Sequence, residues 1–194
     1  MVDVVAHRGC SGRYPENTEV AFLKAIALGV DMIELDVRLS RDRALIVIHD
    51  ATVDRTSDGT GRVGQMTRSE IKELDAGGWF AEEFEGLCFL TLDEALDLIG
   101  GSARLNVELK VADSNRQELV SLAVDCLERR GISRSVFVAS DQESIELARR
   151  IQPHLEICNL SKQPTDTYIT RSLSIGCRIL QPDNAQVDPK FVQQ

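Results

Sequence analysis

Short runs of β-branched and aliphatic residues alternate with helix-like segments along most of this 194-residue chain. Strands are expected at residues 1–6, 32–39, 44–48, 104–110, 135–139, 155–160 and 178–180. Helices are expected at residues 17–28, 67–74, 91–99, 117–130, 142–151 and 165–173, and one more could start at Asp188 and Pro189. Strands that alternate with helices are typical of parallel βα units, and the chain holds about six of them. The pattern therefore predicts an α/β fold built on a parallel sheet.

Length and composition indicate a single globular domain over residues 1–194. Hydrophobic residues make up 43% of the chain and charged residues 27%, values that argue against wholesale disorder. The net charge of −9 argues against a nucleic-acid-binding protein, which needs a basic face. An anionic substrate would be repelled by this charge unless cations line its site locally.

The sequence favours neither a membrane span nor export. No apolar run approaches the ~18 residues that cross a bilayer, and the first one, at residues 4–6, meets His7 and Arg8 at once. The five cysteines are scattered and never spaced as C-x-x-C, which is typical of reduced thiols and not of a disulfide framework or a zinc site. We therefore expect a cytoplasmic protein without a transmembrane segment or signal peptide.

Two acidic residues interrupt the apolar strand expected at residues 32–39. Glu34 and Asp36 alternate with aliphatic residues, so both carboxylates point to the same face of the strand. In a parallel sheet both faces are covered, which makes an exposed charged face a weak explanation. Two buried like charges repel each other and lose hydration, so a divalent cation is the simplest partner for them.

A polar turn at residues 40–43 separates this strand from the run at 44–48, which ends in His49 and Asp50. A hairpin centred near Arg41 and Asp42 would bring His49 roughly opposite Glu34. A titratable imidazole would then lie beside the acidic pair, as acid–base chemistry at a metal requires.

Charged groups also end the strands expected before and after this hairpin, so three consecutive strands finish in charged groups at matching positions. His7 and Arg8 follow the first strand, and Glu108 and Lys110 end the strand at 104–110. In a βα barrel the carboxyl ends of the strands carry the catalytic groups. Together with Glu34 and Asp36, Glu108 would complete an oxygen-only site suited to magnesium or calcium and poor for zinc or copper.

The remaining members of this set suit a phosphate reaction. Arg8 and Lys110 could bind an anionic oxygen, and His7 and His49 offer a base and an acid. Each residue alone has a plainer interpretation: His7 as a capping or core histidine, and Glu108 with Lys110 as a buried ion pair. Asp50 is interpreted as a turn residue.

Residues 51–90 form an irregular excursion with several glycines. Loops of this length are usually functional or disordered, and the embedded aromatic residues favour a functional one. We interpret those aromatics as packing under the loop, not as a ligand platform; they are Trp79, Phe80, Phe84 and Phe89.

The motifs H-R-G, P-E-N-T, E-L-D-V and H-D occur in this order within residues 5–50, and V-E-L-K follows at 107–110. This stretch closely resembles the glycerophosphodiester phosphodiesterase family. The resemblance implies a barrel of the triosephosphate isomerase (TIM) type, (β/α)8. It also implies metal-dependent hydrolysis of small-molecule glycerophosphodiesters to sn-glycerol 3-phosphate and an alcohol, by acid–base catalysis with two histidines.

The same resemblance implies a role for each motif residue. Glu34, Asp36 and Glu108 would be the ligands of a divalent metal ion, Mg²⁺ or Ca²⁺. The acid–base pair would be His7 and His49. Arg8 and Lys110 would hold the phosphate, and Glu16 would shape the pocket beside the metal.

A TIM-type barrel needs about 250 residues and eight strands, whereas this chain accounts for about six units with a long inserted region after the second strand. Strands seven and eight are therefore expected to be missing. A fragment, a shortened homologue and a homo-oligomer that closes the barrel are all open at this point. Alternatives for function are a lysophospholipase D-like phosphodiesterase and a non-catalytic protein that binds metal or phosphodiester.

Overall fold

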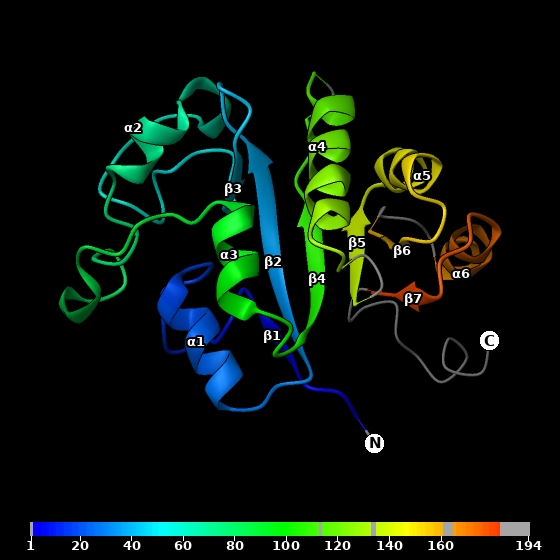
Figure 1. Cartoon of the computed structure of the whole chain (residues 1–194), viewed down its shortest axis with the longest axis horizontal. Coiled ribbons are helices and arrows are strands. Elements are labelled where there is room, and N and C mark those ends of the chain that lie inside the picture. Colours follow the sequence, from blue (N-terminus) through cyan, green and yellow to red (C-terminus); the bar gives the residue numbers. More distant parts are fainter. Residues whose placement is uncertain (1, 113, 133–134, 161–164, 183–194) are drawn as a thin grey trace.

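The computed structural model describes residues 2–112, 114–132, 135–160 and 165–182 and is built around one sheet (Figure 1). Its order is β1-β2-β4-β5-β6-β7, with β3 paired to β2 off this path. Neighbours along the path pair in parallel, whereas β3 pairs antiparallel. The strands are β1 Val5–His7, β2 Met32–Leu39, β3 Leu45–Val47, β4 Arg104–Leu109, β5 Val136–Ser140, β6 Glu156–Asn159 and β7 Ile179–Leu180.

The predicted alternation of strands and helices is confirmed. The helices are α1 Glu19–Ala27, α2 Arg68–Lys72, α3 Leu92–Ile99, α4 Arg116–Arg129, α5 Gln142–Ile151 and α6 Thr165–Ser174, with 3-10 turns η1 Val63–Gln65 and η2 Glu82–Phe84. Thr67 and Thr91 form capping boxes with Glu70 and Glu94, at the starts of the helices expected from residues 67 and 91. The helix predicted near residue 188 lies outside the described residues. No helix within the described ranges is long and apolar enough to cross a bilayer.

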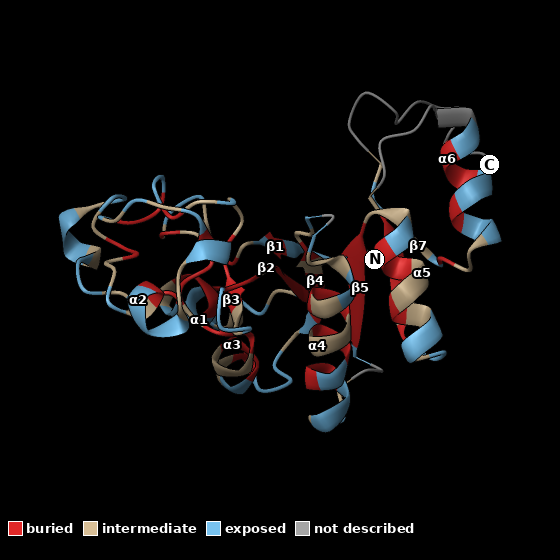
Figure 2. Cartoon of the chain, turned by 90° about the horizontal axis from the view of Figure 1, so that it is seen from above, coloured by how far each residue is buried: buried red, intermediate tan, exposed pale blue. Residues whose placement is uncertain are grey.

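The parallel strands curl into an open half-barrel, and different elements and residues pack against the two faces of its sheet. Figure 2 shows α1, α3 and α4 against one face of the sheet, and the main core lies between them. Ile33, Leu35 and Val37 of β2 are wholly buried in that core. The other face holds an apolar layer that includes Met32 and Phe137. Covered on both faces, β2 tolerates charge only where the charge has partners.

The hairpin between β2 and β3 is present, but its register differs from the prediction. Val37 pairs with Val47, so continuing the ladder brings His49 opposite Leu35 and not Glu34. The reason is a turn longer by one residue, closed by Ser40 N–H donating to Ala44 C=O. Arg43 takes the left-handed conformation in it, with φ of 69°. Such three-residue hairpin loops commonly end in a left-handed residue.

The excursion at residues 51–90 has a small core of its own. Val53, Val63 and Ile71 pack with Phe89 and the hairpin, as predicted for that aromatic. Trp79 and Phe80, in contrast, are 37% and 36% exposed. They pack edge to face against each other, with ring centroids 5.5 Å apart, and Phe80 also contacts Phe84 at 5.8 Å. The two rings thus pack within the loop, as predicted, but at its surface.

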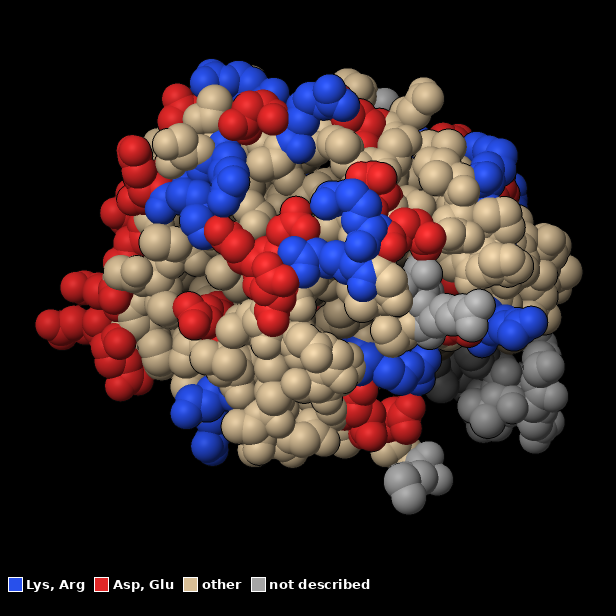
Figure 3. Space-filling model, in the orientation of Figure 1, with Lys and Arg blue, Asp and Glu red and all other residues tan. Residues whose placement is uncertain are grey.

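Acidic and basic side chains lie intermixed in small groups over the face seen in Figure 3. On this face no broad basic surface is present. The charges that bear on function gather instead at the carboxyl ends of β1, β2 and β4.

Candidate active site

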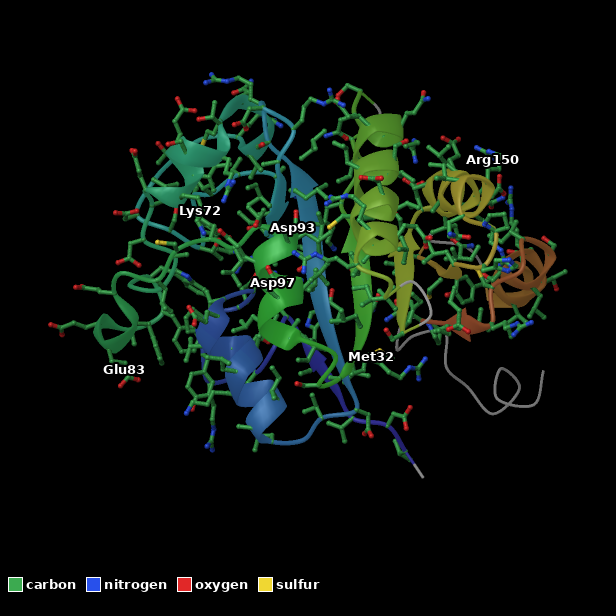
Figure 4. The ribbon with its side chains drawn as sticks, in the orientation of Figure 1. Met32, Lys72, Glu83, Asp93, Asp97 and Arg150 are labelled. Carbon is green, nitrogen blue, oxygen red and sulfur yellow. The ribbon has the colours of Figure 1, made fainter. Side chains whose placement is uncertain are left out.

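The parallel register aligns the charged residues of three neighbouring strands. His7 of β1 pairs with Glu34 of β2, and Asp36 of β2 pairs with Glu108 of β4. Figure 4 labels Met32 near the amino end of β2, so Glu34 and Asp36 follow it toward the carboxyl end. The expectation that charged groups end three strands at matching positions is confirmed.

The three carboxylates Glu34, Asp36 and Glu108 converge. One oxygen from each lies within 4.8 Å of the other two. Glu34 and Asp36 are 3% and 0% exposed. Glu34 Oε1 and Asp36 Oδ1 have no hydrogen-bond partner although they are buried, and Asp36 Oδ1 meets Lys110 Nζ at 3.1 Å outside hydrogen-bond geometry. Unsatisfied carboxylate oxygens at this spacing fit a hard dication such as Mg²⁺ or Ca²⁺.

The close approach of the three carboxylates makes ionisation of Glu34 unfavourable. Burial, followed by the negative charge of Asp36, raises the pKa of Glu34 to about 8. Without a cation, the folded chain therefore holds a proton on Glu34 at neutral pH. A bound dication would replace that proton.

Two cations balance part of the negative charge. Arg8 Nε lies 3.1 Å from Asp36 Oδ2, and Lys110 Nζ contacts both Asp36 and Glu108. The backbone of Arg8 is left-handed, with φ of 58°, and its N–H donates to Glu34 Oε2 at 2.8 Å. An unusual conformation for an arginine is thus stabilised by the contact it makes with the acidic cluster.

Asn17 is a member of the site that sequence reasoning missed. The expected helix begins at residue 17, but Thr18 caps α1 and the Asn17 side chain turns to Asp36. Asn17 Nδ2 donates to Asp36 Oδ2 at 2.9 Å, from a left-handed backbone with φ of 59°. The one sequence signal for this contact is that asparagine tolerates left-handed turns, which is too weak to point to Asp36.

Asp50 and Arg55 were also missed. Asp50 was interpreted as a turn residue, but its Oδ1 lies 2.6 Å from His49 Nδ1. Arg55 holds Asp50 Oδ2 at 2.6 Å and also bonds both carboxylate oxygens of Glu16, which in turn accepts from Arg8. Hydrogen bonds from Arg55 and then from His49, against an opposing effect of burial, hold the pKa of Asp50 well below its usual range. Asp50 is therefore an anion that fixes the orientation of the His49 ring.

His7 stands at the open side of the cluster. Its Nε2 lies 3.8 Å from Glu34 Oε2, too far for a hydrogen bond, and its side chain is 65% exposed. Loss of water on the side of the ring that faces the protein, and then the charge of Arg8, lower the pKa of His7. The ring is neutral at pH 7 and can accept a proton.

Other acidic residues lie apart from this cluster and have their own partners. Figure 4 shows Asp93 and Asp97 on α3, where Arg130 pairs with both. Within the described residues, Glu34, Asp36 and Glu108 are the group of acidic side chains with metal-ligand spacing.

Comparison with known proteins places the chain in a family. A model of the glycerophosphoryl diester phosphodiesterase family matches residues 7–194. The chain belongs to this family. A glycerophosphodiester phosphodiesterase of Caldanaerobacter subterraneus is 42% identical over 156 residues, which are 79% of this chain and 64% of that protein. One of Bacillus altitudinis is 37% identical over 164 residues, 83% of this chain and 67% of that protein. The chain thus spans about two thirds of the length of these relatives.

Solved structures of the family share the fold. A phosphodiesterase of Oleispira antarctica, in complex with the product sn-glycerol 3-phosphate, matches with a TM-score of 0.90 at 28% identity and covers 100% of this chain and 79% of that one. A glycerophosphodiester phosphodiesterase of Agrobacterium tumefaciens matches with a TM-score of 0.85 at 35% identity, covering 100% and 81%. The half-barrel is therefore the TIM-type fold of this phosphodiesterase family, whose members named here are enzymes.

Proposed function

We propose that this protein hydrolyses glycerophosphodiesters to sn-glycerol 3-phosphate and an alcohol, in a reaction that depends on a divalent metal ion. Membership of the family supports the reaction class. The observation that carries the proposal is the set of carboxylate oxygens from Glu34, Asp36 and Glu108, all within 4.8 Å, with Arg8 and Lys110 in contact with the same Asp36.

The three carboxylates would hold the metal, Mg²⁺ or Ca²⁺. When bound, the metal polarises a phosphoryl oxygen and neutralises charge that develops in the transition state. Once the carboxylates serve the metal, Arg8 and Lys110 are available to bind phosphate oxygens. Glu16 shapes the pocket by orienting Arg8, whose Nη1 donates a 3.0 Å hydrogen bond to Glu16 Oε1. These cations give an acidic protein a local site for an anionic substrate.

The two histidines have different surroundings, which supports different roles. We propose that neutral His7 is the general base that assists attack on phosphorus. His49 is the general acid, since its Nδ1 is bonded to anionic Asp50 and its Nε2 is left to protonate the departing alkoxide. The attacking group is either the substrate's own glycerol hydroxyl, through a cyclic phosphate, or water. Detection of a cyclic phosphate during turnover would indicate attack by the glycerol hydroxyl, and its absence would indicate attack by water.

The test is release of glycerol 3-phosphate from water-soluble glycerophosphodiesters and from lysophospholipids, with added Mg²⁺ or Ca²⁺ and with a chelator. We expect release from the water-soluble diesters that the chelator abolishes. Glu34→Gln should lower kcat by at least ~100-fold, whereas Glu83→Gln, an exposed glutamate labelled in Figure 4, should leave it unchanged. Release from lysophospholipids alone would favour the lysophospholipase D-like alternative. No release by the folded, metal-loaded chain would favour a non-catalytic binding protein.

We also propose a cytoplasmic location. All five cysteines are free, and a reducing compartment suits them. Labelling of the thiols in intact and in lysed cells would test this, since a cytoplasmic protein should react with an impermeant reagent only after lysis.

A further inference from the structure

A cavity of about 350 Å³ lies next to the acidic cluster, and Lys110 lines it. Its walls come from the end of β2, the hairpin turn, η1 and the first turn of α4, including Arg38, Arg62 and Asn115. The strand that contributes to these walls, β2, is flanked by β1 and β4 and is therefore not an edge strand of the half-barrel. A volume of this size accommodates a small polar molecule.

The described lining residues leave this cavity positively charged. Arg41 is paired with Glu70 at 3.2 Å, and Glu118 is paired with Arg43. Lys110 is paired with Asp36 and Glu108, so the remaining positive charges of the lining are Arg38 and Arg62. Within the described residues, no ion pair or side-chain hydrogen bond involves Arg62. The cavity therefore contrasts with the chain as a whole, whose net charge is −9.

Arg38 is oriented in the cavity wall by two contacts that do not neutralise it. Its Nε donates to the carbonyl of His49 at 2.8 Å and its Nη1 to the carbonyl of Lys110 at 3.3 Å. A guanidinium has five N–H donors, so donors remain after these two bonds. Both acceptors are backbone atoms, so neither bond pairs the guanidinium with a carboxylate, and the charges of Asp36, Asp50 and Glu108 act on it without a direct ion pair.

Lys110 connects the cavity to the acidic cluster, since its Nζ also lies 3.1 Å from Asp36 Oδ1. We propose that this cavity receives the alcohol arm of the phosphodiester and selects alcohols rich in oxygen acceptors, such as glycerol or inositol, over quaternary amines such as choline. This inference rests on the proposed phosphodiesterase function. A diester with its phosphate at the cluster has one ester arm free to extend past Lys110 into the cavity.

The selectivity follows from charge and hydrogen bonding. Hydroxyl oxygens accept hydrogen bonds from Arg38 and Arg62, whereas a trimethylammonium group offers no acceptor and is repelled. An aromatic cage could bind choline elsewhere, but the Trp79 ring already has the Arg55 guanidinium over it, 6.0 Å from the centroid. One hydrogen bond to a charged group corresponds to about 10- to 100-fold in affinity.

The test compares kcat/KM for diglyceryl phosphate, glycerophosphoinositol and glycerophosphocholine on the metal-loaded chain. We expect the two hydroxyl-rich diesters to be preferred by about tenfold or more. Arg62→Gln should remove most of that preference, and Arg62→Glu should reverse it toward choline. Arg150→Gln, which alters an exposed arginine on α5 labelled in Figure 4, is the matched control and should change nothing.

Binding is measured alongside turnover, by calorimetry of diglyceryl phosphate and glycerophosphocholine with the wild-type chain and the Arg62→Glu variant. If no diester is hydrolysed, the proposed function fails. The proposed role of the cavity is still supported if the Arg62→Glu variant binds diglyceryl phosphate more weakly than the wild-type chain does but binds glycerophosphocholine no more weakly. Equal kcat/KM values for the three diesters would overturn the inference while leaving the phosphodiesterase function intact. An equal loss of kcat/KM for all three diesters in both Arg62→Gln and Arg62→Glu would also overturn the inference.

Discussion

At the residue scale, single side chains decide which chemistry the site can perform. The two histidines have different surroundings, because His7 faces Arg8 and solvent, whereas His49 faces Asp50. Asp50 is in turn held by Arg55, which also holds Glu16. Arg55 therefore acts on the two histidines and Arg8 only through other residues, as a positioning residue.

The contact between Asp50 and His49 leads to the first prediction. Asp50→Asn keeps the side-chain shape but removes the anion that orients His49, so we expect kcat to fall by about 100-fold with KM nearly unchanged. Asp125→Asn, which breaks an exposed pair with Arg129, is the control and should keep wild-type kinetics. Wild-type kcat in Asp50→Asn would contradict the proposed role.

At the element scale, the site depends on how tightly the loop after β1 packs on α1. Gly9 has φ of +76°, and a Cβ at this position would lie 2.8 Å from the backbone of Ala21 in α1. Gly29, just after α1, has φ of +68° but nothing within 4 Å of its Cβ position. The two glycines share a left-handed conformation and differ in the space around them.

The second prediction compares alanine at these two positions. Gly29→Ala should cost only the left-handed conformation, about 1 kcal/mol of unfolding free energy. Gly9→Ala should cost about 1–3 kcal/mol more, because the loop must move away from α1. It should also reduce turnover, since Arg8 N–H would lose its bond to Glu34. Urea unfolding measures both values, and equal losses would mean that the close approach at Gly9 is unimportant.

At the scale of the whole molecule, the acidic cluster links stability to pH and to metal. Burial and the neighbouring Asp36 raise the pKa of Glu34 to about 8, whereas an unfolded glutamate titrates near 4.3. Between these values the folded state binds more protons than the unfolded state, so metal-free stability should fall as pH rises from about 4.5 to 8. A dication that replaces the proton removes this loss.

The third prediction is that Mg²⁺ or Ca²⁺ raises the melting temperature more at pH 8 than at pH 5.5. Metal binding near pH 7 should release close to one proton, detectable by calorimetry in buffers of different ionisation enthalpy. In Glu34→Gln both effects should shrink, because that position no longer titrates. A metal-induced shift independent of pH would show that Glu34 is not protonated in the metal-free chain.

Features that depend on neighbours a few residues apart could be predicted from the amino-acid sequence. The alternation of Glu34 and Asp36 with aliphatic residues predicts β2, and the boxes at Thr67 and Thr91 predict two helix starts, because these contacts lie within one strand or one turn. The convergence of Glu34, Asp36 and Glu108 was also predictable, since parallel strands in register align their carboxyl ends.

Only the tertiary structure decided the contacts that join distant segments. Arg55 reaches Glu16 across 39 residues, and Asn17 reaches Asp36 across 19, over distances where nothing in the local pattern selects a partner. The hairpin register moved by one residue because Arg43 adopts a left-handed conformation that its residue type does not predict. Local propensities determine an element, whereas the orientation of its side chains depends on which other elements pack against it.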